Sequence, residues 1–169
     1  MTCRAMPVLF VAASALAAMA SASAELPASI ASTGGTAVAT FHAEGAQIYE
    51  CKIAPDGKLA WQFREPVATL LLDGKTVGRH YAGPSWAHMD GSAVVAKPIG
   101  NAPGQTQADL PWLKLEVIGH HGTGVFSSAT TIQRINTRGG VTAGVCEQPG
   151  SYLSVPYAAD YIFLRKGSD

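Results

Sequence analysis

The sequence lacks an excess of either charge. Its 169 residues include 12 Lys and Arg, 12 Asp and Glu, and 5 His. Nucleic-acid-binding domains concentrate basic residues, so this balance argues against a nucleic-acid partner. The sequence also has no acidic tail and no long tract of low hydrophobicity, the features typical of disordered chains. The chain is therefore expected to form a nearly neutral, folded domain.

Long hydrophobic runs are also missing, apart from Pro7 to Ala20 near the N-terminus. This run is shorter than the roughly 20 residues of a membrane-spanning helix. Arg4 precedes it and the small residues of the sequence Ala-Ser-Ala, 22–24, follow it. This layout predicts a signal peptide over residues 1–24, cleaved before Glu25. The mature chain is then expected to be periplasmic or extracellular, with no membrane span.

Cysteine is scarce, and one of the three cysteines, Cys3, lies in the predicted signal peptide. Cys51 and Cys146 remain, and in an oxidising compartment they are expected to form a disulfide. The chain-entropy model assigns about 4–5 kcal/mol to closing so long a loop. Two separate buried thiols are the alternative. A redox-active pair is disfavoured because the sequence has no Cys-x-x-Cys.

No apolar pattern with a helical period persists along the mature chain; a period of two dominates. Residues 112–118 show it clearly, with Leu113, Leu115 and Val117 on one face. Turn signals recur at residues 55–57, 73–74 and 90–91. The pattern predicts an all-β fold, a single antiparallel β-sandwich or barrel-like domain of about nine or ten short strands.

The chain is expected to divide into a flexible N-terminal arm, residues 25–36, and a single all-β domain, residues 37–166. Residues 44–46 are expected to form a turn between two strands. Residues 97–111 form the longest irregular stretch, and a loop of this length is usually functional or mobile.

Several sequence blocks occur in a characteristic order. They are Gly45 to Cys51 (GAQIYEC), Gly78 to Trp86 (GRHYAGPSW), Gln133 to Gly140 (QRINTRGG) and Val155 to Phe163 (VPYAADYIF). Together they resemble the domain of unknown function 3455 family of exported bacterial and fungal proteins. The resemblance covers roughly residues 45–164. It implies one exported domain, and its two cysteine positions fit the disulfide, but it assigns no chemistry.

The segment from Gly78 to Ser92 holds the densest group of polar and aromatic residues. We expect His80, Trp86 and Asp90 to face one concavity and to bind a ligand there, because recognition residues usually lie on loops held by a rigid sheet. Trp86 is expected to lie in the Gly-Pro turn and not within a strand, and it is predicted to be an exposed stacking platform. The alternative is that this segment serves the architecture alone and that the tryptophan fills the core.

Arg134 is the fourth candidate ligand-binding residue. It shares a predicted strand face with apolar Ile132, and Asp160 interrupts another apolar run. A buried charge is tolerated when it is paired, so a structural ion pair between Arg134 and Asp160 is expected. The alternative is that Arg134 holds a carboxylate or phosphate of a ligand.

His80, His88 and Asp90 are the candidate metal ligands, since metals bind these side chains. The sequence has no His-x-His and no His-Glu-x-x-His, so no metal or other cofactor is assigned. A hydrolytic site would use Ser85 or Ser92 as the nucleophile, together with His80 and Asp90. The Gly-x-Ser-x-Gly motif of hydrolases is absent, however.

The function predicted from these features is a binding module for a small molecule or an envelope component. The alternative is a secreted enzyme, metal-dependent or hydrolytic, that uses the region of His80 and Asp90.

Overall fold

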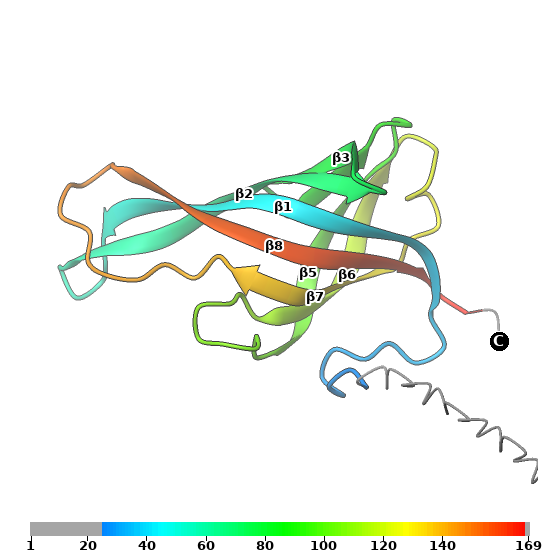
Figure 1. The fold of residues 1–169 in the computed structure, drawn as a ribbon, viewed down its shortest axis with the longest axis horizontal. Coiled ribbons are helices and arrows are strands. Elements are labelled where there is room, and N and C mark those ends of the chain that lie inside the picture. Colours follow the sequence, from blue (N-terminus) through cyan, green and yellow to red (C-terminus); the bar gives the residue numbers. More distant parts are fainter. Residues whose placement is uncertain (1–24, 168–169) are drawn as a thin grey trace, which may run out of the picture.

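The computed structural model describes residues 25–167, which form eight antiparallel strands closed into one barrel (Figure 1). Each strand pairs with the next along the chain, and the last pairs with the first. This confirms the all-β class and the barrel-like alternative. The strands are β1 (Thr36–Ile53), β2 (Leu59–Leu72), β3 (Lys75–Tyr81), β4 (Ser85–His88), β5 (Ala93–Ala102), β6 (Trp112–His121), β7 (Thr131–Gly139) and β8 (Tyr152–Arg165).

The number of strands is smaller than predicted because β1 and β2 are longer than expected. The expected turn at residues 44–46 is wrong: Gly45 lies inside β1 and pairs with Ala68 on one side and Tyr157 on the other. A Cβ atom at Gly45 would collide with the Val67 carbonyl and with Ala68. The glycine therefore allows neighbouring backbones to approach closely within a strand. In the sequence, such a glycine looks the same as a glycine of a turn.

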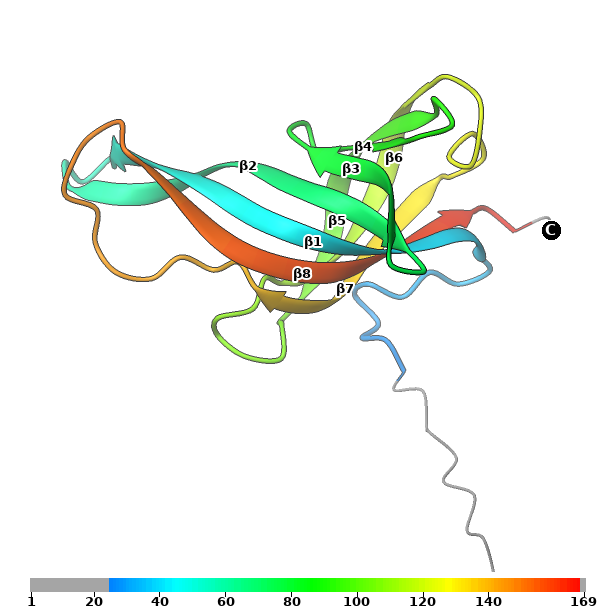
Figure 2. The same cartoon turned by 45° about the horizontal axis from the view of Figure 1, so that its top comes forward.

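The strands β1, β2 and β8 extend beyond the closed barrel. β3 pairs only with residues 68–72 of β2, and β7 pairs only with residues 157–164 of β8. The remaining parts of β2 and β8 pair with the second half of β1. They form a twisted three-stranded ribbon that projects from the body of the molecule (Figures 1 and 2).

Aromatic side chains fill the barrel at the end away from this ribbon. Phe126, in the connection between β6 and β7, is fully buried. Its ring centroid lies 4.3 Å from that of Phe163 and 6.0 Å from that of Phe41. Large rings at these distances pack densely and exclude water. This end of the barrel is therefore a solid core.

The predicted disulfide between Cys51 and Cys146 is confirmed, with 5.7 Å between the two Cα atoms. Cys51 lies near the end of β1, and Cys146 lies in the long connection between β7 and β8. The Tyr49 hydroxyl also donates a hydrogen bond to the Gly140 carbonyl oxygen, at 2.7 Å. Both links hold this connection against the projecting ribbon.

The irregular stretch predicted at residues 97–111 is shorter in the structure, because β5 continues to Ala102. The remaining connection is fixed by Asp109, whose carboxylate accepts hydrogen bonds from the Gly139 amide and the Thr106 hydroxyl. Leu110 in the same connection is buried.

The segment before β1 contacts the barrel. Ile30 is fully buried, its carbonyl oxygen accepts a hydrogen bond from the Gln133 amide, and the Ala31 carbonyl accepts one from the Lys114 ammonium.

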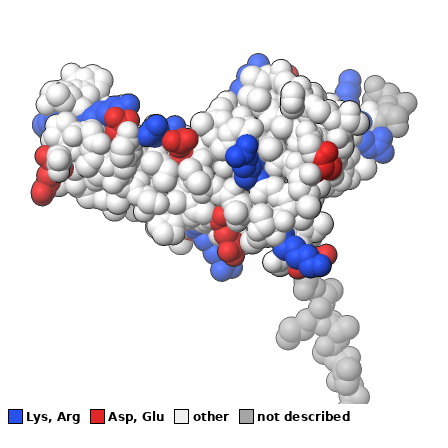
Figure 3. All heavy atoms as spheres, turned by 90° about the horizontal axis from the view of Figure 1, so that it is seen from above, with Lys and Arg blue, Asp and Glu red and all other residues white. Residues whose placement is uncertain are grey.

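The predicted signal peptide lies outside the described residues. Within residues 25–167, no helix is long and apolar enough to cross a membrane. Basic and acidic side chains are interspersed on the face that Figure 3 shows.

Candidate functional site

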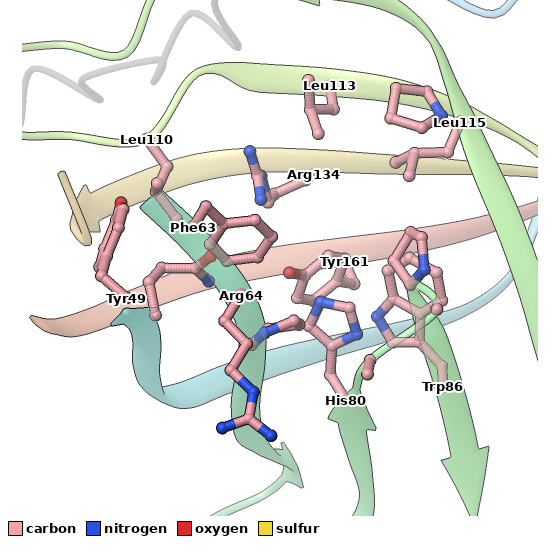
Figure 4. A pocket seen from close by; sticks show the side chains of 16 residues that line it. Tyr49, Phe63, Arg64, His80, Trp86, Leu110, Leu113, Leu115, Arg134 and Tyr161 are labelled. Carbon is pink, nitrogen blue, oxygen red and sulfur yellow. The ribbon is translucent and has the colours of Figure 1, made fainter. Parts of the chain in front are cut away.

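The barrel contains a cavity of about 550 Å³ at the end toward the ribbon (Figure 4). All eight strands contribute to its lining, because inward-facing residues alternate along each strand of a barrel. The volume lies within the range of small-molecule sites, roughly 300–1,000 Å³.

The walls of the cavity are apolar and stiff. Aromatic and proline rings hold their shape, since they have few rotatable bonds. Phe63 stands near Tyr49, with the ring centroids 5.9 Å apart in an edge-to-face arrangement. The apolar lining includes Phe63, Pro66, Pro84, Pro98, Leu110, Leu113 and Leu115.

Arg134 brings a positive charge into this apolar space. It lies on β7 opposite Tyr161 of β8, and its Nε and Nη2 atoms donate hydrogen bonds to the Pro111 carbonyl oxygen, at 3.2 and 2.9 Å. No described residue forms a carboxylate ion pair with it. The described lining residues include a second arginine, Arg64, and no Asp or Glu. The cavity therefore favours an anion.

Arg64 differs from Arg134 in its surroundings. Its Nε atom lies 3.3 Å from the Glu65 carboxylate, and its side chain is 47% exposed. Its guanidinium also lies over the ring of Tyr152, at 4.9 Å from the centroid. Because solvent and Glu65 already screen this charge, Arg134 is the cation that an enclosed ligand would meet.

His80 lies deeper in the cavity and is 3% exposed. Its Nδ1 atom is 2.9 Å from the Ser85 carbonyl oxygen. A carbonyl only accepts, so Nδ1 carries the proton and Nε2 keeps a lone pair while the ring is neutral. Burial lowers the pKa of His80 to about 4, the Ser85 carbonyl opposes this effect and the charge of Arg134 adds to it. His80 is therefore neutral near pH 7.

Trp86 stacks on His80, with the ring centroids 4.3 Å apart and the planes inclined by 9°. Tyr161 packs against both rings, at 5.1 Å from His80 and 5.3 Å from Trp86. Burial raises the pKa of Tyr161, while Arg134 opposes this effect. These contacts fix the deep end of the cavity, where Figure 4 shows His80, Trp86 and Tyr161 together.

Two hydrogen-bond donors of the lining are buried without a partner among the described residues. They are the Trp86 Nε1 atom and the Gln47 Nε2 atom. Burial raises the pKa of Tyr157, and Gln47 opposes this effect. A buried donor without a partner costs about 1–3 kcal/mol, so each would gain from an acceptor on a ligand.

The structure brings together three of the four residues proposed from the sequence. His80, Trp86 and Arg134 line the cavity, but Asp90 does not. Asp90 lies beyond the other end of β4, where its carboxylate accepts hydrogen bonds from the amides of Ser92 and Val125, at 2.8 and 2.7 Å. It fixes two connections there, so the convergence of Asp90 with His80 and Trp86 is wrong.

The prediction that Trp86 is an exposed platform is also wrong, since its exposure is 1%. Trp86 is the second residue of β4 and pairs with Val94 of β5 and His80 of β3, both buried. Its side chain therefore faces the inside of the barrel. The Gly-Pro turn ends at Pro84, so Trp86 lies in a strand and not in the turn.

The predicted ion pair between Arg134 and Asp160 is wrong as well. Arg134 aligns with Tyr161, which is buried inside the barrel. Asp160 is the preceding residue, so it lies on the outer face, where it contacts His42 Nδ1 and Asn136 Nδ2, each at 2.8 Å. Successive residues of a strand face opposite sides, which separates the two charges.

The candidate metal ligands do not gather at one point. His88 Nδ1 lies 3.1 Å from Asp90 Oδ2, but His80 lines the cavity at the other end of β4. Within residues 25–167, no group of three or more His, Cys, Asp or Glu side chains is placed to hold a metal ion. In the same range, neither the Ser85 nor the Ser92 hydroxyl hydrogen-bonds to a histidine, and Ser92 Oγ donates to Asp90.

Gln47 and Tyr161 line the cavity but were not predicted from the sequence. Both alternate in phase with buried neighbours, Gln47 with Tyr49 and Tyr161 with Phe163. This alternation marks an inward-facing polar residue, and it is the signal that was available. It does not by itself show that the barrel interior is hollow there.

The fold and the cavity together define an up-and-down β-barrel with a lumenal cavity at one end. The sequence matches the model of the family described as "Protein of unknown function (DUF3455)" over residues 31–76 and 71–165. The chain belongs to this family, as the sequence blocks suggested. Searches of curated proteins and of solved structures found no match.

Proposed function

We propose that this protein is a binding module that holds a small, largely apolar anion inside its barrel. The observation that supports the proposal most directly is Arg134. It is a cation without a carboxylate partner among the described residues, and it lines an apolar cavity of about 550 Å³ with no acidic residue among its described lining. Arginine recognises carboxylates well because its planar donors match their two oxygens.

The cavity supports this reading in two further ways. Apolar walls supply affinity in proportion to the apolar surface that a ligand buries, about 25 cal/mol per Å². The disulfide and the hydrogen bond from Tyr49 to Gly140 hold the connection beside the ribbon in place before a ligand arrives. A preformed site loses less conformational entropy on binding. We also propose that the protein acts in the periplasm or outside the cell, where its disulfide persists.

Isothermal titration with apolar carboxylates and matched alcohols tests the proposal. Decanoate and cinnamate should bind to the purified protein, whereas 1-decanol and cinnamyl alcohol should bind at least tenfold more weakly. Arg134→Gln should reduce carboxylate affinity by about tenfold to a hundredfold, because a charge-assisted hydrogen bond contributes about 1.5–3 kcal/mol. Alcohol affinity should stay the same in that variant.

Arg64→Gln is the matched control, since Arg64 also lines the cavity but pairs with Glu65. It should change carboxylate affinity less than threefold. Equal losses in the two variants would point to a general effect of positive charge. A carboxylate affinity that is unchanged in Arg134→Gln would overturn the proposed role of Arg134.

A further inference from the structure

The deep end of the cavity carries a second polar feature, separate from Arg134. His80 Nε2 holds a lone pair, and no hydrogen bond to it is formed by any described residue. The residue is buried, with an exposure of 3%. The stacked Trp86 ring offers the complementary group, an Nε1–H donor that is buried without a partner. An acceptor and a donor therefore stand on two adjacent rings.

A hydroxyl group complements such a pair. It donates one hydrogen bond and accepts up to two, so it can serve the lone pair of His80 and the N–H of Trp86. A methyl group or hydrogen would leave both ring nitrogens without partners. A carboxylate could accept from Trp86 but would place its lone pairs against that of His80.

The surroundings of this pair favour a flat ligand. The rings of His80, Trp86 and Tyr161 lie within 5.3 Å of one another, and Tyr49 and Phe63 form a second aromatic pair of the lining. Aromatic ligands gain from offset or edge-to-face contacts with such rings, beyond the area they bury. Flexible chains gain no such contribution and lose more entropy on binding.

From these contacts we propose that the ligand is an aromatic hydroxy acid, held by its carboxylate at Arg134 and by its hydroxyl at His80 and Trp86. This inference rests on the proposed binding of an anion in the cavity and adds the chemistry of the other end of the ligand. His80 acts as a hydrogen-bond acceptor, which it does only while its ring is neutral. Its low pKa, caused mainly by burial, keeps it neutral across the physiological range.

Calorimetric titration with a series of cinnamates tests this inference. The probes are cinnamate, its three isomers with one ring hydroxyl, and the matching methoxy compounds. At least one hydroxy isomer should bind about tenfold more tightly than cinnamate, the gain of one buried hydrogen bond. Its methoxy counterpart should lose that gain, because an ether oxygen cannot donate to His80 Nε2.

His80→Phe keeps a ring to stack on Trp86 and removes the acceptor. In this variant the affinity for the favoured hydroxy isomer should lose most of its tenfold gain over cinnamate, because the hydrogen bond to His80 is gone, while the affinity for cinnamate itself should change little. His121→Phe, at an exposed position outside the cavity, is the matched control and should leave the whole series unchanged. If His80→Phe does not fold, the series on the wild-type protein still decides whether the hydroxyl of the ligand is recognised, because equal binding of cinnamate and its hydroxy isomers would overturn that contact.

The outcomes separate this inference from the proposed function. If cinnamate and all its hydroxy isomers bind equally, the hydroxyl contact is wrong while anion binding stands. If a hydroxy isomer gains affinity but keeps the gain in His80→Phe, the assignment to His80 is wrong. If no carboxylate binds to the wild-type protein, both the proposed function and this inference fail.

Discussion

His80 is a titratable residue held neutral inside the barrel, and this couples stability to pH. Its pKa is lowered from 6.5 to about 4, mainly by burial. An unfolded chain binds a proton at this histidine as the pH falls below about 6.5, whereas the folded protein does so only near pH 4. The stability that the neutral ring provides is therefore complete above pH 6.5 and is lost as the pH falls toward 4.

The resulting prediction concerns the wild-type protein and His80→Phe. The free energy of unfolding of the wild type should fall between pH 7 and pH 4 by about 3 kcal/mol more than that of the variant, since one pKa unit corresponds to about 1.4 kcal/mol. Urea denaturation at a series of pH values measures both slopes. His121→Phe should keep the wild-type slope, and equal slopes for all three proteins would contradict a low pKa at His80.

At the scale of the strand, Gly45 decides whether β1 is continuous. It lies between β2 and β8, and a Cβ there would collide with the backbone of Val67. A backbone atom of a central strand cannot move aside without disturbing the ladder on both sides. The cost of overpacking such a position is typically about 1–3 kcal/mol.

Gly45→Ala should therefore destabilise the protein by about 1–3 kcal/mol or more, measured by urea denaturation. Gly119→Ala is the matched control, because Gly119 also lies in a strand but its added Cβ would meet its nearest atom, Val95 Cβ, at 4.0 Å. That variant should be neutral or slightly stabilising, since alanine restricts the unfolded chain more than glycine does. Similar midpoints for the two variants would refute the close approach at Gly45.

At the scale of the whole molecule, the disulfide joins two parts of the chain that are 95 residues apart. It links the end of β1 to the connection that leads into β8, and these two strands also pair along most of their length. The bridge therefore restricts the unfolded chain over more than half of its length. This restriction is the main source of disulfide stabilisation in the chain-entropy account.

Cys51→Ser should lower the free energy of unfolding by about 2–5 kcal/mol. Cys146→Ser and the double variant should show nearly the same loss, because all three remove one bond and the effects are not additive. Denaturation of the oxidised wild type and the three variants gives the comparison. A double variant that loses twice as much as either single variant would mean that the two side chains act separately.

The sequence by itself determined the all-β class, the pairing of Cys51 with Cys146 and the inward direction of Arg134. Each follows from local information: a period of two, a count of cysteines, and the phase of a residue relative to apolar neighbours. The turn at residues 73–74 was also predicted from the sequence. In the structure, Asp73 and Gly74 both adopt the positive φ that such a turn requires.

Only the tertiary structure decided the partners of these residues. Asp90 and His80 are ten positions apart, but β4 separates them along its length, so one fixes a connection and the other lines the cavity. Asp160 and Tyr161 are adjacent, yet only Tyr161 faces Arg134. Strand register and barrel closure set these neighbours through contacts between residues far apart in the chain, and no local pattern encodes which inward positions surround a hollow and which fill a core.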